Sequence, residues 1–255
     1  MVSLPPLTMP TLQLSTKDSA LTKYKPTKSR CSPFLTPLAY FLGQRFLLPL
    51  YFGKILVNGQ ENLPKTGPVI LAPTHRARWD SLVLPVAAGR PVTGRDLRFM
   101  VTADEVKGLQ GWFIRRLGGF PVNVRRPTIS SLRHGIDLLL EKAMLVIYPE
   151  GGIFRDNQVH RLKPGLARLA VQAEAVQHGL GVQIVPVSLR YDVPFPTWRS
   201  TVEITFGKPI AVADYLSDDY TADALKAHAK QLTADLQTAM VTLSDTAGHS
   251  SVNAA

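Results

Sequence analysis

Cysteine is almost missing from this sequence of 255 residues, which contains only Cys31. A single thiol excludes an internal disulfide framework and a zinc site built from several cysteine ligands. It also favours a reducing compartment. The Gly-x-Ser-x-Gly motif of nucleophilic hydrolases is missing as well, so no serine or cysteine nucleophile is evident.

Acidic residues are scarce at the start of the chain, where Asp18 is the only one within residues 1–33. The same segment is rich in serine, threonine, proline and lysine, a composition that predicts a flexible basic tail. A transit peptide has a similar composition but carries more arginine than this segment does. No run of basic residues leads into a compact apolar stretch, so we expect no secretory signal peptide.

A long uninterrupted apolar run is also missing. Residues 34–57 are the most apolar part of the chain, but a membrane-spanning helix needs about 20 consecutive apolar residues. We expect instead an interfacial helical hairpin over 34–57, with Arg45 and Lys54 reaching the lipid headgroups. The alternative is a hairpin buried against the rest of the protein. The run is interrupted by Pro37, Gly43, Gln44, Arg45, Pro49, Gly53 and Lys54.

Positive charge is in excess, with a formal net charge of +10. This excess favours an anionic partner, which could be nucleic acid, a phospholipid surface or a phosphorylated substrate. The arginines are not interleaved with aromatic residues on a predicted strand platform, as they are in many RNA-binding folds. We therefore expect no nucleic-acid partner.

Strand-like apolar runs alternate with segments of helical period from residue 67 onward, and apolar residues make up 45% of the chain. This order is typical of an α/β fold, and it predicts a largely parallel mixed sheet flanked by helices. We expect this domain over 58–243 and a flexible tail over 244–255. The expected strands are 67–74, 97–102, 120–124, 144–148, 182–190 and 201–206, and the expected helices include 129–140, 166–176 and 221–243.

The segment 75–80 (HRARWD) combines an imidazole and a carboxylate directly after a buried strand. Five positions correspond to about 140° of rotation on a helix and to opposite faces on a strand, so His75 and Asp80 meet only if the chain turns between them. A helix that begins near Asp80 supplies the turn and favours a carboxylate at its N-terminus. Asp80 would then accept one ring N–H of His75 and leave the other nitrogen as a general base. The alternatives are two residues that do not interact, or a metal hydrolase that also uses His160 but lacks a recognisable ligand motif.

Three further pieces of sequence accompany this segment. They are 118–126 (GGFPVNVRR), 148–152 (YPEGG) followed by 163–165 (KPG), and 184–188 (IVPVS). In order and spacing, the four pieces together resemble the glycerolipid acyltransferase family, the group of bacterial 1-acylglycerol-3-phosphate acyltransferases. The resemblance extends over residues 57–210.

The resemblance implies a role for each matching residue. His75 matches the catalytic base, Asp80 its orienting partner, and Arg125 an arginine that binds the acceptor phosphate, a role that suits a guanidinium fork. The sequence departs from the family pattern at Thr74, where asparagine is usual, and at Ile153, where an arginine is common. These departures concern the identity of the acceptor more than the reaction type. The candidate substrate-binding residues are Arg125, Arg126, Glu150, Gly151, Gly152, Arg155 and Lys163.

The resemblance also implies an activity. This is transfer of a fatty acyl group from acyl-ACP or acyl-CoA to the sn-2 hydroxyl of lysophosphatidate, giving phosphatidate, with the thioester as cosubstrate and no other cofactor or metal. The alternatives are glycerol 3-phosphate or another lysophospholipid as acceptor, or a non-enzymatic lipid-binding protein with the same fold. We expect a peripheral or monotopic membrane protein on the cytoplasmic face, with the phospholipid surface, the acceptor and the thioester donor as partners.

Overall fold

The computed structural model describes residues 30–123, 129–217 and 219–252. The strands are β1 (Lys54–Asn58), β2 (Val69–Pro73), β3 (Leu97–Thr102), β4 (Gly119–Val122), β5 (Met144–Val146), β6 (Gln183–Tyr191), β7 (Thr201–Phe206) and β8 (Ile210–Ala211). They form one sheet in the order β1-β7-β6-β2-β5-β3-β4, with β8 paired to β6. Strand β6 is antiparallel to β7 and β8, and the other pairs are parallel. The predicted largely parallel mixed sheet is confirmed.

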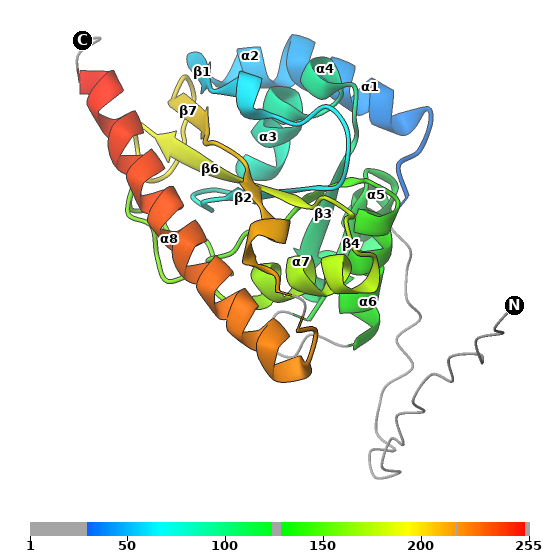
Figure 1. The fold of residues 1–255 in the computed structure, drawn as a ribbon. Coiled ribbons are helices and arrows are strands. Elements are labelled where there is room, and N and C mark those ends of the chain that lie inside the picture. The colour runs from blue at the N-terminus through cyan, green and yellow to red at the C-terminus, as the bar shows by residue number, and fades with distance from the viewer. Residues whose placement is uncertain (1–29, 124–128, 218, 253–255) are drawn as a thin grey trace, which may run out of the picture.

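Helices cover both faces of this sheet. Figure 1 shows the first four helices over one face and the last three over the other. The helices are α1 (Leu35–Leu42), α2 (Leu48–Tyr51), α3 (Asp80–Ala88), α4 (Arg90–Thr93), α5 (Gly108–Arg116), α6 (Ile129–Leu140), α7 (Gly165–Val176) and α8 (Ala222–Val252). A π-helical turn is formed by Gly43–Leu47, and 3-10 turns by Gln60–Asn62, Ala103–Glu105 and Val212–Tyr215.

Strand β2 lies inside the sheet and divides the core into two halves. All its residues are buried, as expected for a continuous apolar run between two helical layers. Val69 and Leu71 pack into the cluster beneath α2 and α3, whereas Ile70 and Ala72 pack into the cluster with α6, α7 and α8. Because successive side chains of a strand point to opposite faces, β2 contributes to both halves of the core.

The expected helical hairpin over 34–57 differs from the structure in two respects. First, α1, the π-helical turn and α2 follow one another without a non-helical residue, so the chain does not reverse between two helices. A π-helical turn lets one helix accommodate an interruption such as Gly43 without turning back. Second, Lys54–Asn58 form β1, which pairs with β7. A short apolar run does not distinguish strand from helix by its period, which explains this error.

Parts of both predicted tails belong to ordered structure. The backbone N–H groups of Arg30 and Ser32 donate to the carbonyls of Arg115 and Arg116, so the end of the 1–33 segment is packed against α5, while residues 1–29 lie outside the described part. At the other end, α8 continues to Val252, although we expected a flexible tail from residue 244. Ser244 is buried, because α8 still packs on the sheet at that point.

Candidate active site

His75 and Asp80 face each other at the carboxyl end of β2. The strand ends at Pro73 and α3 begins at Asp80, so the intervening loop supplies the predicted turn. His75 Nδ1 lies 2.8 Å from Asp80 Oδ2. The predicted pairing of the two side chains is therefore present. Thr74 holds the strand end in place, because its hydroxyl accepts the Leu189 N–H at 2.9 Å.

Asp80 is completely buried, and its carboxylate accepts several hydrogen bonds. Oδ2 accepts the backbone N–H of Arg76 at 2.7 Å and that of Ala77 at 3.0 Å, in addition to the His75 ring. Oδ1 accepts the hydroxyl of Tyr191 at 2.7 Å. Trp79, and not Asp80, occupies the N-cap position of α3. The backbone N–H groups that Asp80 accepts therefore belong to the loop before the helix and not to its first turn. One carboxylate thus holds both the loop and the imidazole in position.

The imidazole of His75 is fixed on a second side by an aromatic ring. It stacks on Tyr148 with a centroid distance of 4.0 Å, and 17% of the side chain remains exposed. The bond to Asp80 places the proton on Nδ1, which leaves Nε2 with its lone pair and, within the described residues, without a hydrogen-bond partner. A partly exposed Nε2 lone pair is what a general base requires.

Two tyrosines next to Asp80 were not among the predicted site residues. Burial and the neighbouring Asp80 carboxylate raise the pKa of Tyr191 and of Tyr148 well above the ordinary value, so both hydroxyls keep their protons. Tyr191 is the last residue of β6, and β6 pairs with β2 in the middle of the sheet. Only its place three residues after the 184–188 piece could have drawn attention to it in the sequence.

Glu150 is a second buried carboxylate that braces the same loop. Its Oε2 accepts the backbone N–H of His75 at 2.9 Å, and its Oε1 accepts that of His160 at 2.9 Å. Arg76 pairs with it at 3.0 Å, and both side chains are nearly free of solvent contact. The carboxylate that we expected to bind the acceptor therefore has its contacts inside the protein, where it anchors the backbone of His75.

The sequence profile of the acyltransferase family matches residues 54–190, more than half of the chain. The chain belongs to the acyltransferase family. The matched region contains both members of the His75–Asp80 pair and the buried Glu150.

Individual relatives carry more specific names. The chain is 28% identical over 151 residues to a 1-acyl-sn-glycerol-3-phosphate acyltransferase of Streptococcus pneumoniae, covering 57% of this chain and 51% of that protein. It is 27% identical over 124 residues to a protein of the same name from Bacillus subtilis, covering 48% and 59%. A third relative, glycerol-3-phosphate O-acyltransferase 1 of Saccharomyces cerevisiae, is 33% identical over 104 residues, covering 39% and 14%. The matches thus span little more than half of the bacterial relatives.

A solved structure confirms the fold of this chain. The crystal structure of the 1-acyl-sn-glycerophosphate (LPA) acyltransferase PlsC from Thermotoga maritima matches with a TM-score of 0.55 and 20% identity, covering 80% of this chain and 79% of that one. At this identity the likeness concerns the fold.

The remaining predicted substrate-binding residues are not hydrogen-bonded to His75 where the structure describes them. Gly151 has a positive φ of 70°, and its carbonyl accepts the ammonium of Lys163 at 3.3 Å. Gly152 follows it in the loop after β5. Arg125 and Arg126 lie outside the described residues.

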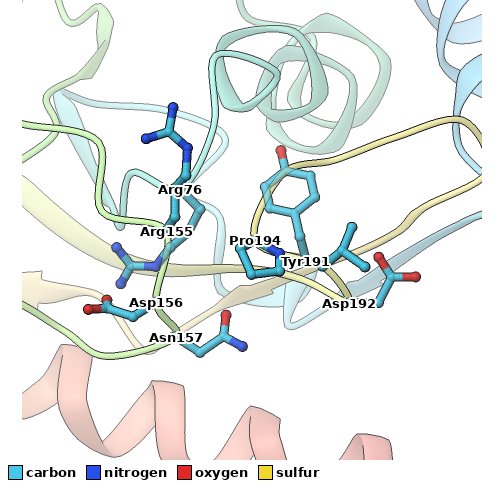
Figure 2. Close-up of a pocket in the computed structure, with 8 residues that line it drawn as sticks. Arg76, Arg155, Asp156, Asn157, Tyr191, Asp192 and Pro194 are labelled. Carbon is cyan, nitrogen blue, oxygen red and sulfur yellow. The ribbon is translucent and has the colours of Figure 1, made fainter.

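Arg155 belongs to a neighbouring cavity. This cavity of about 270 Å³ lies between the loop after β5 and the loop after β6, and His75 is not part of its lining. Figure 2 shows Arg155 on one side of the cavity and Tyr191 and Pro194 on the other. The cavity therefore adjoins the residues that support Asp80 and Glu150, and Arg155 is not brought to the imidazole itself. The lining residues are Arg76, Arg155, Asp156, Asn157, Tyr191, Asp192, Val193 and Pro194.

Proposed function

We propose that this protein transfers a fatty acyl group from acyl-ACP or acyl-CoA to the sn-2 hydroxyl of a lysophosphatidate-type acceptor, giving phosphatidate. The observation that carries this proposal is the His75–Asp80 hydrogen bond of 2.8 Å, which leaves Nε2 as a base at the carboxyl end of a parallel strand. Ligands of open α/β sheets commonly bind at that end. The names of the two bacterial relatives support the acceptor.

The proposed reaction needs no covalent intermediate on the protein. Nε2 of His75 takes the proton of the acceptor hydroxyl while the oxygen attacks the thioester carbonyl carbon and forms the new C–O bond. The tetrahedral intermediate then breaks its C–S bond, and the imidazolium returns the proton to the leaving sulfur. Asp80, held by three further hydrogen bonds, keeps its contact with Nδ1 and stabilises the imidazolium.

We propose further that the reaction takes place at a membrane, with the protein bound peripherally or monotopically on the cytoplasmic face. A single unpaired thiol is compatible with that compartment. No helix in the described part of the chain is long and apolar enough to span a bilayer. The continuous helical segment from α1 to α2 exposes many apolar side chains to solvent and carries the exposed Arg45 at its middle. Apolar residues next to a basic residue are typical of a helix that lies in a membrane interface. Its exposed apolar residues are Phe34, Leu38, Phe41, Leu42, Phe46, Leu47 and Leu50.

The proposal is tested with purified protein, both thioester donors and a set of glycerol phosphate and lysophospholipid acceptors, with the lipid products identified by mass. We expect phosphatidate from lysophosphatidate, and we expect His75→Ala to lower kcat by about 10²–10⁴-fold because the base is lost. His178→Ala removes an exposed histidine far from the site and serves as the matched control. Near-native turnover by His75→Ala would refute the assignment of the base. Lipid binding without any acyl transfer would indicate a non-enzymatic protein.

A further inference from the structure

A second exposed apolar surface lies on the loop between β6 and β7, residues 192–200, here called the β6–β7 loop. Phe195 is 66% exposed and Trp198 is 60% exposed, and Val193 beside them is also exposed. Scattered apolar side chains are common on protein surfaces, but two large aromatic rings at one loop apex are a concentrated patch. Such a patch marks a surface that binds a partner.

The β6–β7 loop is held in shape by hydrogen bonds to the end of α2. The hydroxyl of Tyr51 donates to the carbonyl of Pro196 at 2.8 Å, and the backbone N–H of Arg199 donates to the carbonyl of Tyr51 at 2.7 Å. Within the loop, Ser200 Oγ accepts the Thr197 N–H at 2.8 Å. The exposure of Phe195 and Trp198 is therefore imposed by a braced loop.

The same tyrosine joins the loop to the membrane surface proposed for α1 and α2, and to the catalytic segment. Tyr51 meets Trp198 edge-on at a centroid distance of 6.4 Å and stacks on Trp79 at 4.1 Å. Trp79 lies between His75 and Asp80 in the chain. An apolar surface thus continues from α2 to the β6–β7 loop and passes beside the active site.

Positive charge accompanies the aromatic residues of the loop. The guanidinium of Arg155 lies 4.5 Å from the centroid of the Phe195 ring. Arg199 of the loop is exposed, and so is Lys54, which pairs with Thr201 in the sheet. Asp192 is the acidic residue of the loop, and its carboxylate accepts the backbone N–H of Thr201 at 2.9 Å. Aromatic rings beside arginines suit the headgroup region of a bilayer, where the rings enter the acyl boundary and the cations meet phosphates.

We propose that the β6–β7 loop is a second membrane-docking element, which inserts Phe195 and Trp198 into the interface of an anionic phospholipid bilayer. This inference rests on the proposed action at a membrane. Attachment at α1–α2 alone leaves the protein free to roll about the helix axis. A second contact on the other side of Tyr51 removes that freedom and turns the side of the protein that bears Trp79 and His75 toward the lipid, from which the acceptor must come.

The test is sedimentation with vesicles of phosphatidylcholine, with and without phosphatidylglycerol. We expect the double variant Phe195→Ser, Trp198→Ser to lose about tenfold in partition coefficient, because the apolar area of two inserted rings corresponds to at least that factor. Val176→Ser removes an exposed apolar residue at the end of α7 and is the matched control, which we expect to bind like the unaltered chain. Unchanged vesicle binding by the double variant overturns the proposal.

Two further measurements keep the result interpretable. Brominated lipids quench an inserted tryptophan, so Trp198→Phe should remove part of the quenching of the otherwise unaltered protein, and quenching that does not change overturns the proposal. With a short-chain acceptor dispersed below its micelle concentration, the double variant should keep its kcat, because no membrane is needed. If the unaltered chain were inactive in this assay, the proposed reaction would be wrong, and the vesicle result would remain valid. If the variant lost affinity for acyl carrier protein and not for vesicles, the occupant would be a protein and the proposal would be wrong.

Discussion

At the scale of single residues, the site consists of a small exposed part and a large buried support. Only the His75 ring reaches solvent, whereas Asp80, Arg76 and Glu150 are buried. Each buried charge has partners, as burial of an ionised group requires. The support therefore determines the orientation of the imidazole, and substitutions in it should alter catalysis without touching a substrate.

Tyr191→Phe removes the donor to Asp80 Oδ1 and leaves the packing of the ring unchanged. We expect kcat to fall about tenfold or more, since a hydrogen bond to a charged group contributes about 1.5–3 kcal/mol. A rate profile of the variant and of the control Tyr220→Phe measures this. A kcat equal to that of the control would mean that Tyr191 does not help to position Asp80.

Glu150→Gln breaks the buried pair with Arg76 and puts an amide N–H₂ among groups that donate to the carboxylate. We expect a loss of about 3–5 kcal/mol in the free energy of unfolding, because an uncompensated guanidinium charge stays buried. Urea unfolding measures it, with the exposed Glu141→Gln as control. In protein that still folds, kcat should fall while KM for the acceptor stays unchanged. A raised KM with full stability would instead support direct binding of the acceptor by Glu150.

At the scale of secondary structure, the site depends on how strands end and helices begin. β2 delivers His75, α3 begins at Asp80, and the end of β6 delivers Tyr191. The long helix α8 supports this arrangement from below: Arg190 of β6 donates to the carbonyl of Ser244 at 3.1 Å, and the Ser244 hydroxyl donates to the carbonyl of Asn157 at 3.4 Å. The last turns of α8 thus hold the end of β6 and the loop after β5, which both line the cavity of Figure 2.

Ending the chain after Leu243 tests this support. We expect a loss of about 1–3 kcal/mol in the free energy of unfolding, because Arg190 and Asn157 lose hydrogen bonds and the buried Ala247 is removed. Thermal unfolding measures the effect, and a chain ending after Val252 is the control that retains α8. Equal melting temperatures for the two truncated chains would show that the last turns do not contribute.

At the scale of the whole molecule, charge and apolar surface act together. The chain carries a net charge of +10, and the α1–α2 side and the β6–β7 loop present apolar residues around the same aromatic cluster. A basic protein of this kind is attracted to an anionic bilayer before its apolar groups insert. The electrostatic part of this attraction is sensitive to salt, and the apolar part is not.

Vesicle binding at rising sodium chloride separates the two contributions. With anionic vesicles, we expect the partition coefficient to fall steadily from low salt to physiological ionic strength, where the Debye length is about 8 Å. With neutral vesicles, the residual binding should stay nearly constant, since it depends on the exposed apolar side chains. Binding to anionic vesicles that does not depend on salt would mean that the net charge has no part in membrane attachment.

The sequence by itself determined the layered α/β fold and the chemistry at one position. The apolar run 69–73 predicts a strand and the helical period of 166–176 predicts a helix, because both patterns depend only on neighbouring residues. The turn required between His75 and Asp80 follows from helix and strand geometry alone. Local pattern was insufficient for 34–57, because a short apolar run fits a strand as well as a helix and α1 to α2 have no obligatory turn.

Only the tertiary structure decided which distant residues support the base. Tyr191 lies 111 positions from Asp80, Glu150 lies 75 from His75, and Tyr51 lies 145 from Pro196. These contacts depend on the strand order, which places β6 and β5 on either side of β2, and strand order is not encoded in any local period. The hydrogen-bonded support of His75 and the shape of the β6–β7 loop therefore arise from packing, whereas the pairing of His75 with Asp80 could be predicted from the chain.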